Sequence, residues 1–538
     1  MFFWLLQITN QTYLIMKKSV FYTLILSISF SFFYSCDKKE KIVVAPKYTI
    51  SIDSVISSKA PALQSFTHGL YNDEWLLFAG RTNKKDDDGG LHDMRKNSDY
   101  AKESFPPTSF NENIYVYNPS TNKAPKSITI NEMIAAIAEN FTSYNLDTIT
   151  KYTAVFKNTN ALVKQVDDYL FIVGGFGPAD FKNPKNGYTT YNHVARIHIP
   201  SMVHLVKKEY SKVKEAKLFA FAQNKNLIST GGELHYIGGS TIKKGTFYLA
   251  GGHNFGNSAP SFSQGQKYVD AVYPFTIGPK VINKDTIQHV LSISVSEPIS
   301  DVSDPNGVSS DNNSIFRRRD GPITPSLYYN SLENTLEESI AIYAGVFKPG
   351  EDLQAWNDAI YVHPNWTNSN NKLYTYDKTY NQKNLNVYSC PNLVAYDANS
   401  KILHTFLLGG IGDGNTTKEV RLSGFTNTGT HIKLYVESNP LKSTNTTFSQ
   451  NLFAKNTTNS KPFYGAEAIF FPSSNFISTT VSPDILDTSS VFGETKKSVE
   501  VGYIFGGIEA FSSHPGTYGR TKSRASNKVW KVTLKQQF

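Results

Sequence analysis

Six segments of the chain repeat one pattern of apolar and polar positions. Each holds three or four consecutive apolar residues, then Gly or Gly-Gly, then a polar stretch. A short continuous apolar run is typical of a strand buried on both faces, and a following glycine permits positive φ and a close backbone approach. The six segments are Trp75–Gly80, Leu170–Gly175, Phe247–Gly252, Ile340–Gly345, Phe406–Gly410 and Tyr503–Gly507.

Other strand signals flank these segments. First strands precede them, as in Ser65–Tyr71 and Asn392–Tyr396, through turn residues such as Asn72-Asp73. Strands with alternating aromatic residues follow them at Asn113–Asn118, Asn371–Asp377 and Asn527–Val532. The pattern predicts units of four antiparallel strands, which is the construction of a β-propeller.

The number of copies sets the expected number of blades. Six copies predict six blades, and seven is the alternative if the partial copy His235–Gly239 marks a blade of its own. We expect the strand around Trp530 to pair with the N-terminal segment Tyr48–Val55 and so to close the ring. No long segment shows clean helical periodicity, so the fold class expected is all-β.

The order of these elements resembles the kelch and galactose-oxidase-central-domain propellers, in particular kelch-like lipoproteins of the Bacteroidota. The copies lie roughly 65 to 95 residues apart, against about 50 in a plain kelch repeat, so several blades carry long loops. The resemblance covers about residues 50–538 and implies a kelch-type β-propeller, but no activity. The similar stretches are Trp75–Thr82, Gly90–His92, Arg318–Asp320 and Cys390–Asp397, with departures at the insert Asn83–Gly89 and at the single glycines Gly80 and Gly345.

Composition permits a large core and argues against nucleic acid as a partner. Apolar residues make up 40% of the chain, with 31 Tyr and 35 Phe, whereas charged residues make up only 18%. The formal net charge is +9, but the one dense basic run, Arg317–Arg319, is three residues long. A nucleic-acid-binding protein should show a basic stripe or cluster on one element, so we expect no such partner.

The N-terminus has the layout of a bacterial export signal. Met16-Lys17-Lys18 precedes an apolar run of about 15 residues and the pair Ser35-Cys36, which matches a signal peptide better than a membrane-spanning helix. Cys36 resembles the lipidation site of a bacterial lipoprotein. We therefore expect a signal at residues 1–36 with Met16 as the start, a polar tether at 37–47, and one propeller domain at 48–538. Lipidation of Cys36 would leave Cys390, the second of two cysteines, without a disulfide partner.

Candidate ligand-binding residues lie in the loops that follow the glycines, because propeller loops converge over the central channel. They are Arg81, His92, His253, Arg318, Arg319, Glu509 and His514. Two or three arginines with a glutamate would suit a carboxylated sugar, since Arg binds carboxylates through two hydrogen bonds. The structural alternative is that the arginines pair with Asp320 and backbone carbonyls to tie blades together.

Other chemistries lack support in the sequence. Asp86–Asp88 lack the alternating spacing of a calcium loop, and Gly410–Gly414 lack the Lys-Ser/Thr pair of a nucleotide loop. Cys390 has no His close by in sequence for copper chemistry of the galactose-oxidase kind, so it is expected to be a small buried apolar residue. No metal and no cofactor are expected.

Two functions from different classes remain. The first is a monomeric, non-catalytic binding or scaffold protein on the outer membrane, held by its lipid and engaging a glycan or an envelope protein. The alternative is a carbohydrate-active enzyme of the sialic-acid mutarotase or lyase type, with Arg and Glu at the channel mouth. Convergence of Arg81, one of Arg317–Arg319 and Glu467 or Glu509 in one deep pocket would favour the enzyme, and dispersal would favour binding.

Overall fold

The apolar segments that end in glycine form strands in the computed structural model. Each lies inside its sheet, with a hydrogen-bonded neighbour on both sides, which explains why these runs are apolar without alternation. Their positions agree with the sequence-based prediction. They are β3 (Glu74–Phe78), β7 (Tyr169–Val173), β13 (Thr246–Ala250), β19 (Thr335–Tyr343), β24 (Ile402–Asp413) and β29 (Ser498–Phe505).

The described residues belong to one unit, Lys47–Gln537. Cys36, His92 and His514 lie outside them. The structure describes residues 47–55, 59–83, 91, 105–121, 123–238, 245–255, 266–301, 313–346, 348–349, 355–365, 372–382, 385–413, 424–453, 462–512 and 523–537.

Three sheets have four strands each, in which neighbouring strands are antiparallel. The first runs β2 (Thr67–Tyr71), β3, β4 (Asn113–Tyr117), β5 (Lys126–Thr129). The second runs β18 (Ile323–Asn330), β19, β20 (Ala359–Val362), β21 (Tyr374–Asp377). The third runs β27 (Ile469–Pro472), β29, β32 (Val529–Gln537), β1 (Lys47–Ser54).

Two larger sheets hold most of the remaining strands. An eight-stranded sheet runs β12 (Glu233–Ile237), β13, β16 (Tyr273–Ile282), β17 (Asp285–Val295), β11 (Phe219–Gln223), β10 (His193–His198), β7, β6 (Leu162–Val166). A six-stranded sheet holds β26 (Lys442–Thr447), β25 (Phe425–Tyr435), β24, β23 (Asn392–Asp397) and β28 (Leu486–Asp487), with β22 (Asn386–Tyr388) beside β24. Two-stranded sheets are β8 (Phe176–Pro178) with β9 (Tyr188–Thr190), β14 (His253–Phe255) with β15 (Gln266–Tyr268), and β30 (Ile508–Ala510) with β31 (Ser523–Ala525).

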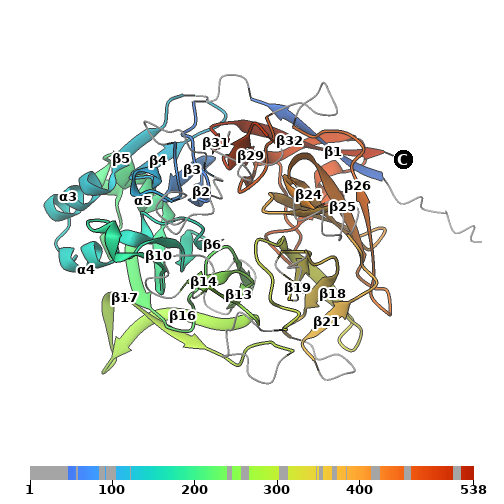
Figure 1. The fold of residues 1–538 in the computed structure, drawn as a ribbon, viewed down its shortest axis with the longest axis horizontal. Coiled ribbons are helices and arrows are strands. Elements are labelled where there is room, and N and C mark those ends of the chain that lie inside the picture. Colours follow the sequence, from blue (N-terminus) through green and yellow to red (C-terminus); the bar gives the residue numbers. More distant parts are fainter. Residues whose placement is uncertain are drawn as a thin grey trace, which may run out of the picture. The chain divides into compact units, whose positions relative to one another are not determined.

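The eight-stranded sheet consists of two four-stranded halves that a single bridging residue pair joins into one ladder. β11 and β17 meet in parallel through one residue pair, Phe221 and Val290, while every other neighbouring pair in this sheet is antiparallel. β12 pairs with β13, so the partial glycine copy at His235 begins no separate sheet. Figure 1 shows the sheets following one another in chain order around a common centre, which fits the predicted β-propeller.

The first and last sheets meet, and strands from both ends of the described chain share the last one. β1 pairs with β32 over eight residues, from Lys47 opposite Gln537 to Ser54 opposite Trp530, which confirms the predicted pairing. Trp75 of the first sheet stacks on Phe471 of the last with ring centroids 4.2 Å apart. Apolar packing between neighbouring sheets thus continues across the junction of the two ends.

Helices cover part of the outside of a fold that is otherwise nearly all β, as expected. The longest begins with a capping box: Thr129 accepts from the Glu132 amide and Glu132 accepts from the Thr129 amide, a sequence signal that the strand pattern obscured. No helix among the described residues is long and apolar enough to cross a membrane. The α-helices are α3 (Ile130–Asn140), α4 (Leu146–Lys151), α5 (Ile199–Val206) and α6 (Thr488–Phe492), and the 3₁₀ turns are η1 (Pro107–Ser109), η2 (Thr153–Val155), η3 (Pro184–Asn186), η4 (Tyr210–Lys212) and η5 (Glu215–Lys217).

The Gly-Gly or Ala-Gly pair that follows each apolar run adopts the left-handed backbone conformation. Both residues of every pair have φ between 51° and 100°, a region that costs an ordinary residue roughly 1–2 kcal/mol. Alanine nevertheless holds the first position in two pairs, so φ alone does not explain the glycines. The pairs are Ala79–Gly80, Gly174–Gly175, Gly251–Gly252, Ala344–Gly345, Gly409–Gly410 and Gly506–Gly507.

Close contact with the backbone segment before the next first strand explains why glycine holds the other positions of these pairs. The amide of Gly175 donates to the carbonyl of Ser229 at 3.0 Å, and Ser229 lies just before β12, in the other half of the eight-stranded sheet. A Cβ on Gly174 would lie 2.0 Å from that same oxygen. The other donors with their acceptors are Gly80 to Asn158 at 2.6 Å, Gly252 to Arg318 at 2.8 Å, Gly410 to Tyr464 at 3.2 Å and Gly507 to Leu63 at 2.8 Å.

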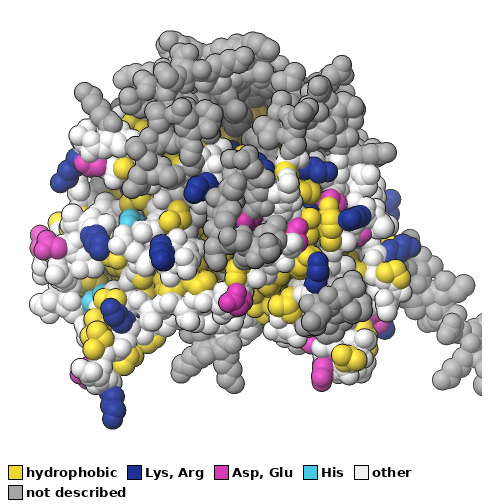
Figure 2. Space-filling model, turned by 60° about the horizontal axis from the view of Figure 1, so that its bottom comes forward, with side chains coloured by type: hydrophobic (Ala, Val, Ile, Leu, Met, Phe, Trp, Pro, Cys, Tyr) yellow, Lys and Arg dark blue, Asp and Glu magenta, His cyan; other side chains and the backbone are white. Residues whose placement is uncertain are grey.

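The β16–β17 hairpin carries apolar side chains into solvent. Val281, Ile282 and Ile287 are 54%, 48% and 37% exposed, and the hairpin projects at the lower left of Figure 2. Lys and Arg side chains are scattered over this view rather than gathered into one patch. The visible face therefore shows no continuous basic surface over its described residues.

Substitution of Gly174 tests the contact between sheets. We expect Gly174→Ala to destabilise the fold by at least about 2 kcal/mol more than Gly493→Ala, because it adds steric overlap and disturbs a hydrogen bond. Gly493 is the matched control, since it also has positive φ but no atom within 4 Å of its Cβ position. Urea unfolding measures both, and equal losses would show that backbone strain alone requires the glycines.

Candidate functional site

Six residues, one at or just before the start of each innermost strand, form a ring. All six have φ between 48° and 65°. Five hydrogen bonds run from the amide of each later residue to the carbonyl of the one before it, at 2.8–3.3 Å, and the sixth junction is a side-chain bond from Ser65 Oγ to Glu467 Oε2 at 2.7 Å. The ring consists of Ser65, Asn160, Gly231, Asp320, Ser389 and Glu467.

The strands that follow this ring line a cavity of about 630 Å³. Strands β2, β6, β12, β18, β23 and β27 all contribute, together with the segment that leads from β27 toward β28. A cavity of this size is typical of a small-molecule site. Its ionisable residues are His68, Lys164, Asp167, Glu233, His235, Asp320, Cys390, Glu467 and Asp484, and its aromatic residues are Phe66, Tyr236, Phe470, Phe471 and Phe476.

Three carboxyl groups of the cavity bind protons more tightly than in water. Glu233 is reached by solvent but surrounded by protein, and this desolvation, followed by the negative charge of Glu467, raises its pKa to about 7. Desolvation also raises the pKa of Glu467, with the charge of Asp320 adding to the effect. The pKa of Asp320 is raised by burial, against the opposing charge of Arg319.

The basic groups of the cavity supply little free positive charge. Lys164 forms an ion pair with Asp484. Burial lowers the pKa of both His68 and His235 to about 4, so both imidazoles are neutral at pH 7. The described lining is therefore rich in hydrogen-bond acceptors and poor in cations.

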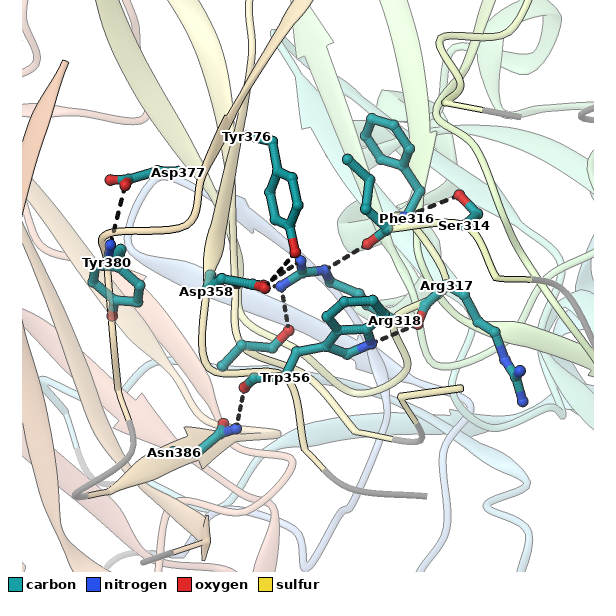
Figure 3. Close-up of polar contacts among 12 residues, drawn as sticks. Ser314, Phe316, Arg317, Arg318, Trp356, Asp358, Tyr376, Asp377, Tyr380 and Asn386 are labelled. Carbon is teal, nitrogen blue, oxygen red and sulfur yellow. Dashed lines mark hydrogen bonds and ion pairs between the residues drawn. The ribbon is translucent and has the colours of Figure 1, made fainter. Parts of the chain in front are cut away.

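Arg318 is a structural residue. It is 1% exposed, and its guanidinium donates to the carbonyls of Ile315 at 2.8 Å and Ala344 at 2.9 Å and to Asp358 Oδ1 at 2.6 Å (Figure 3). The guanidinium also lies over the ring of Trp356, 4.4 Å from the centroid. The bonds to backbone carbonyls match the structural alternative, but the partners flank β18, β19 and β20 of one sheet and do not join two sheets. They occupy most of the donors that a ligand would need.

Arg319 and Arg81 approach the cavity without lining it. Arg319 Nε lies 2.9 Å from Asp320 Oδ2, so its charge is directed to a ring residue. Arg81 Nε donates to Gln64 Oε1 at 3.0 Å, Gln64 donates to Ser65 Oγ, and Ser65 donates to Glu467. Arg81 is therefore linked to the ring residue Ser65 through one intervening side chain, that of Gln64.

The remaining candidates lie farther along the loops. Glu509 is 3% exposed and accepts from Tyr464 Oη at 3.0 Å and Arg524 Nε at 2.7 Å. His253 is 4% exposed, and burial together with the charge of Arg319 holds its pKa well below the usual range. The predicted arginines and glutamates do not converge in one pocket, and among them only Glu467 lines the cavity.

Sequence reasoning missed Glu233 and the role of Asp320 as a ring residue. The predicted site residues lie in the loops after the glycines, whereas the residues that line the cavity lie at the starts of the first strands. A short polar or glycine position just before each first strand was the available signal. The thiol of Cys390 also lines the cavity, but burial raises its pKa to about 12, so it is a poor nucleophile. Among the described residues, no group of three or more His, Cys, Asp or Glu is placed to hold a metal ion.

Comparison with solved structures shows a distant likeness of fold. No family model matches the chain, and neither does any curated protein. The solved structure of YjhT is similar over 89% of this chain and 99% of that one, at 10% sequence identity and a TM-score of 0.41. At this distance the likeness assigns no ligand and no activity.

Removal of Arg318 should weaken the fold and not only a site. We expect Arg318→Ala to cost about 3–5 kcal/mol, because it leaves Asp358 and two carbonyls without their donor. Lys401→Ala, which removes an exposed ion pair with Glu437, should cost less than about 1 kcal/mol. Denaturant unfolding compares the two variants, and similar small losses would return Arg318 to the list of ligand-binding candidates.

Proposed function

We propose that the chain is a lipid-anchored, extracytoplasmic carbohydrate-binding protein, built on a six-bladed kelch-type propeller with four antiparallel strands per blade. The sheet orders support this division, since the eight-stranded sheet falls into two halves and β23–β26 form a further unit. β1 supplies the outer strand of the last blade. The protein acts as a monomer and does not bind nucleic acid.

The cavity at the centre of the sheets carries the proposal. Sugar hydroxyls donate hydrogen bonds, and the lining offers carboxyl oxygens and neutral imidazoles as acceptors. The apolar faces of a sugar ring pack on aromatic side chains, which the partly buried Phe470 and Phe476 provide at one side of the lining. Burial makes these hydrogen bonds selective for the matching sugar, because a sugar that leaves a buried acceptor unpaired binds at a cost in free energy.

The charge of the lining narrows the class of sugar. Its described lysine is already paired with Asp484, and Arg319 is paired with Asp320. A carboxylated sugar would meet Glu233 and Glu467 with no free counter-ion among the described residues. A neutral or cationic carbohydrate suits the site better.

A carbohydrate-active enzyme is the second candidate, and one observation favours it. A carboxyl with a pKa of about 7, as in Glu233, is suited to general acid–base catalysis near neutral pH. Mutarotation needs only such proton transfers at the ring oxygen and the anomeric hydroxyl. Interconversion of sugar anomers by the protein, lost in Glu233→Gln, would establish this function over simple binding.

Blocking the cavity should abolish carbohydrate binding. We expect Asn392→Trp, at the cavity wall, to lower affinity for a glycan-array hit at least tenfold while the unfolding temperature holds. Leu332→Trp is the control, since Leu332 is 83% exposed at a hairpin tip away from the cavity. Undiminished binding by Asn392→Trp would place the glycan on the outer loops, and no hit at all would contradict the proposed function.

The anchor is tested separately. Cys36→Ala should move the protein from the membrane fraction to the soluble fraction and remove incorporation of labelled palmitate, because a diacylated cysteine holds the chain by buried acyl CH₂ groups of about 0.8 kcal/mol each. Cys390→Ala should keep both properties. Membrane retention of an unlabelled Cys36→Ala protein would exclude this anchor.

A further inference from the structure

Two carboxyl groups in the cavity form no ion pair with a described residue. Asp484 is paired with Lys164 and Asp320 with Arg319. The side chain of Glu233 has no hydrogen bond with any described residue, and Glu467 is hydrogen-bonded by the neutral residues Ser65 and Ser389. Glu233 begins the third innermost strand and Glu467 lies two residues before the sixth, and their charges repel each other. The charges of Lys164 and Arg319 oppose this effect, but the pKa of both carboxyl groups stays raised, so a bound cation would stabilise the pair.

The imidazole of His235, in the same cavity, has one nitrogen without a hydrogen-bond partner among the described residues. His235 is 8% exposed, and its Nε2 donates to the carbonyl of Ile323 at 3.3 Å. That bond fixes the tautomer and leaves Nδ1 as a lone-pair acceptor, for which the described residues supply no donor. His235 follows Glu233 by two positions on β12, so both side chains point to the same side of the strand.

We propose that the cavity binds a carbohydrate bearing a protonated amine, with the ammonium group between Glu233 and Glu467 and a hydroxyl donating to His235 Nδ1. This inference rests on the proposed function and names its ligand class. An ammonium group has three donors and no acceptor, which matches a site of acceptors. It also removes the repulsion between the two carboxylates.

A metal ion and a plain neutral sugar fit the same groups less well. A hard cation requires six or more oxygen ligands in close geometry, and the described residues form no such cluster. A neutral sugar would satisfy the acceptors without supplying the charge. The aromatic side chains Phe470 and Phe476 add a face on which the ring of an amino sugar can pack.

Calorimetry with three matched sugars tests the inference on the complete mature protein. D-glucosamine carries the amine, D-glucose has a hydroxyl in its place, and N-acetyl-D-glucosamine has a neutral amide. At pH 7 we expect glucosamine to bind at least tenfold more tightly than the other two, as charge-assisted hydrogen bonds are the stronger class. If glucose binds as tightly as glucosamine or more tightly, and Asn392→Trp abolishes that binding, the requirement for an amine is wrong while the proposed carbohydrate binding stands.

A charge-removing variant locates the amine. Glu233→Gln keeps the shape of the side chain and should weaken glucosamine binding tenfold or more, a larger factor than any loss in glucose binding. Glu437→Gln, at an exposed ion pair with Lys401, should change neither affinity. The unfolding temperature of Glu233→Gln should not fall, because the substitution removes a like charge beside Glu467. Unchanged glucosamine affinity in a folded Glu233→Gln protein, displacement of glucosamine by calcium chloride, or no binding of any of the three sugars would overturn the inference.

Discussion

Hydrogen bonds between neighbouring sheets, made by residues in the left-handed conformation, are the constraint on which this structure depends. In five of the six pairs the second glycine donates to the segment before the next first strand, and five of the six ring residues donate to the ring residue before them. Both contacts need positive φ, and the first also needs an approach too close for a Cβ at Gly174. The protein therefore joins its sheets through backbone geometry, and apolar packing such as Trp75 on Phe471 fills the space between them.

The same constraint creates the site. Because the ring draws six strands together, their side chains enter one confined space, where carboxyl groups lose water and repel one another. Glu233, Asp320 and Glu467 have raised pKa values for this reason. Arg318 and Arg319 serve the frame around that space: one ties carbonyls and Asp358 together, and the other neutralises Asp320. The acidic, cation-poor lining thus follows from the ring of hydrogen bonds that holds the six strands together and from the pairing of the arginines in the surrounding frame.

Sequence analysis located the frame better than the site. The apolar runs ending in glycine and the pairing of Tyr48–Val55 with the last strands were predictable, because burial on both faces and edge closure leave strong local patterns. The helix at Ile130–Asn140 was missed because its capping box stands inside a polar, strand-rich context. Glu233 could not be chosen from sequence, since its significance comes from Glu467, more than two hundred residues away. Arg318 was assigned to a ligand because its partners Ala344 and Asp358 are joined to it only by the fold.

The central claim is that the space enclosed by the six innermost strands is the ligand site. A crystal structure of the mature protein grown with D-glucosamine tests this claim directly. The account predicts density for the sugar in that cavity, with its amine within hydrogen-bond distance of Glu233 and Glu467. Density only on the outer loops, with the cavity filled by water, would contradict it.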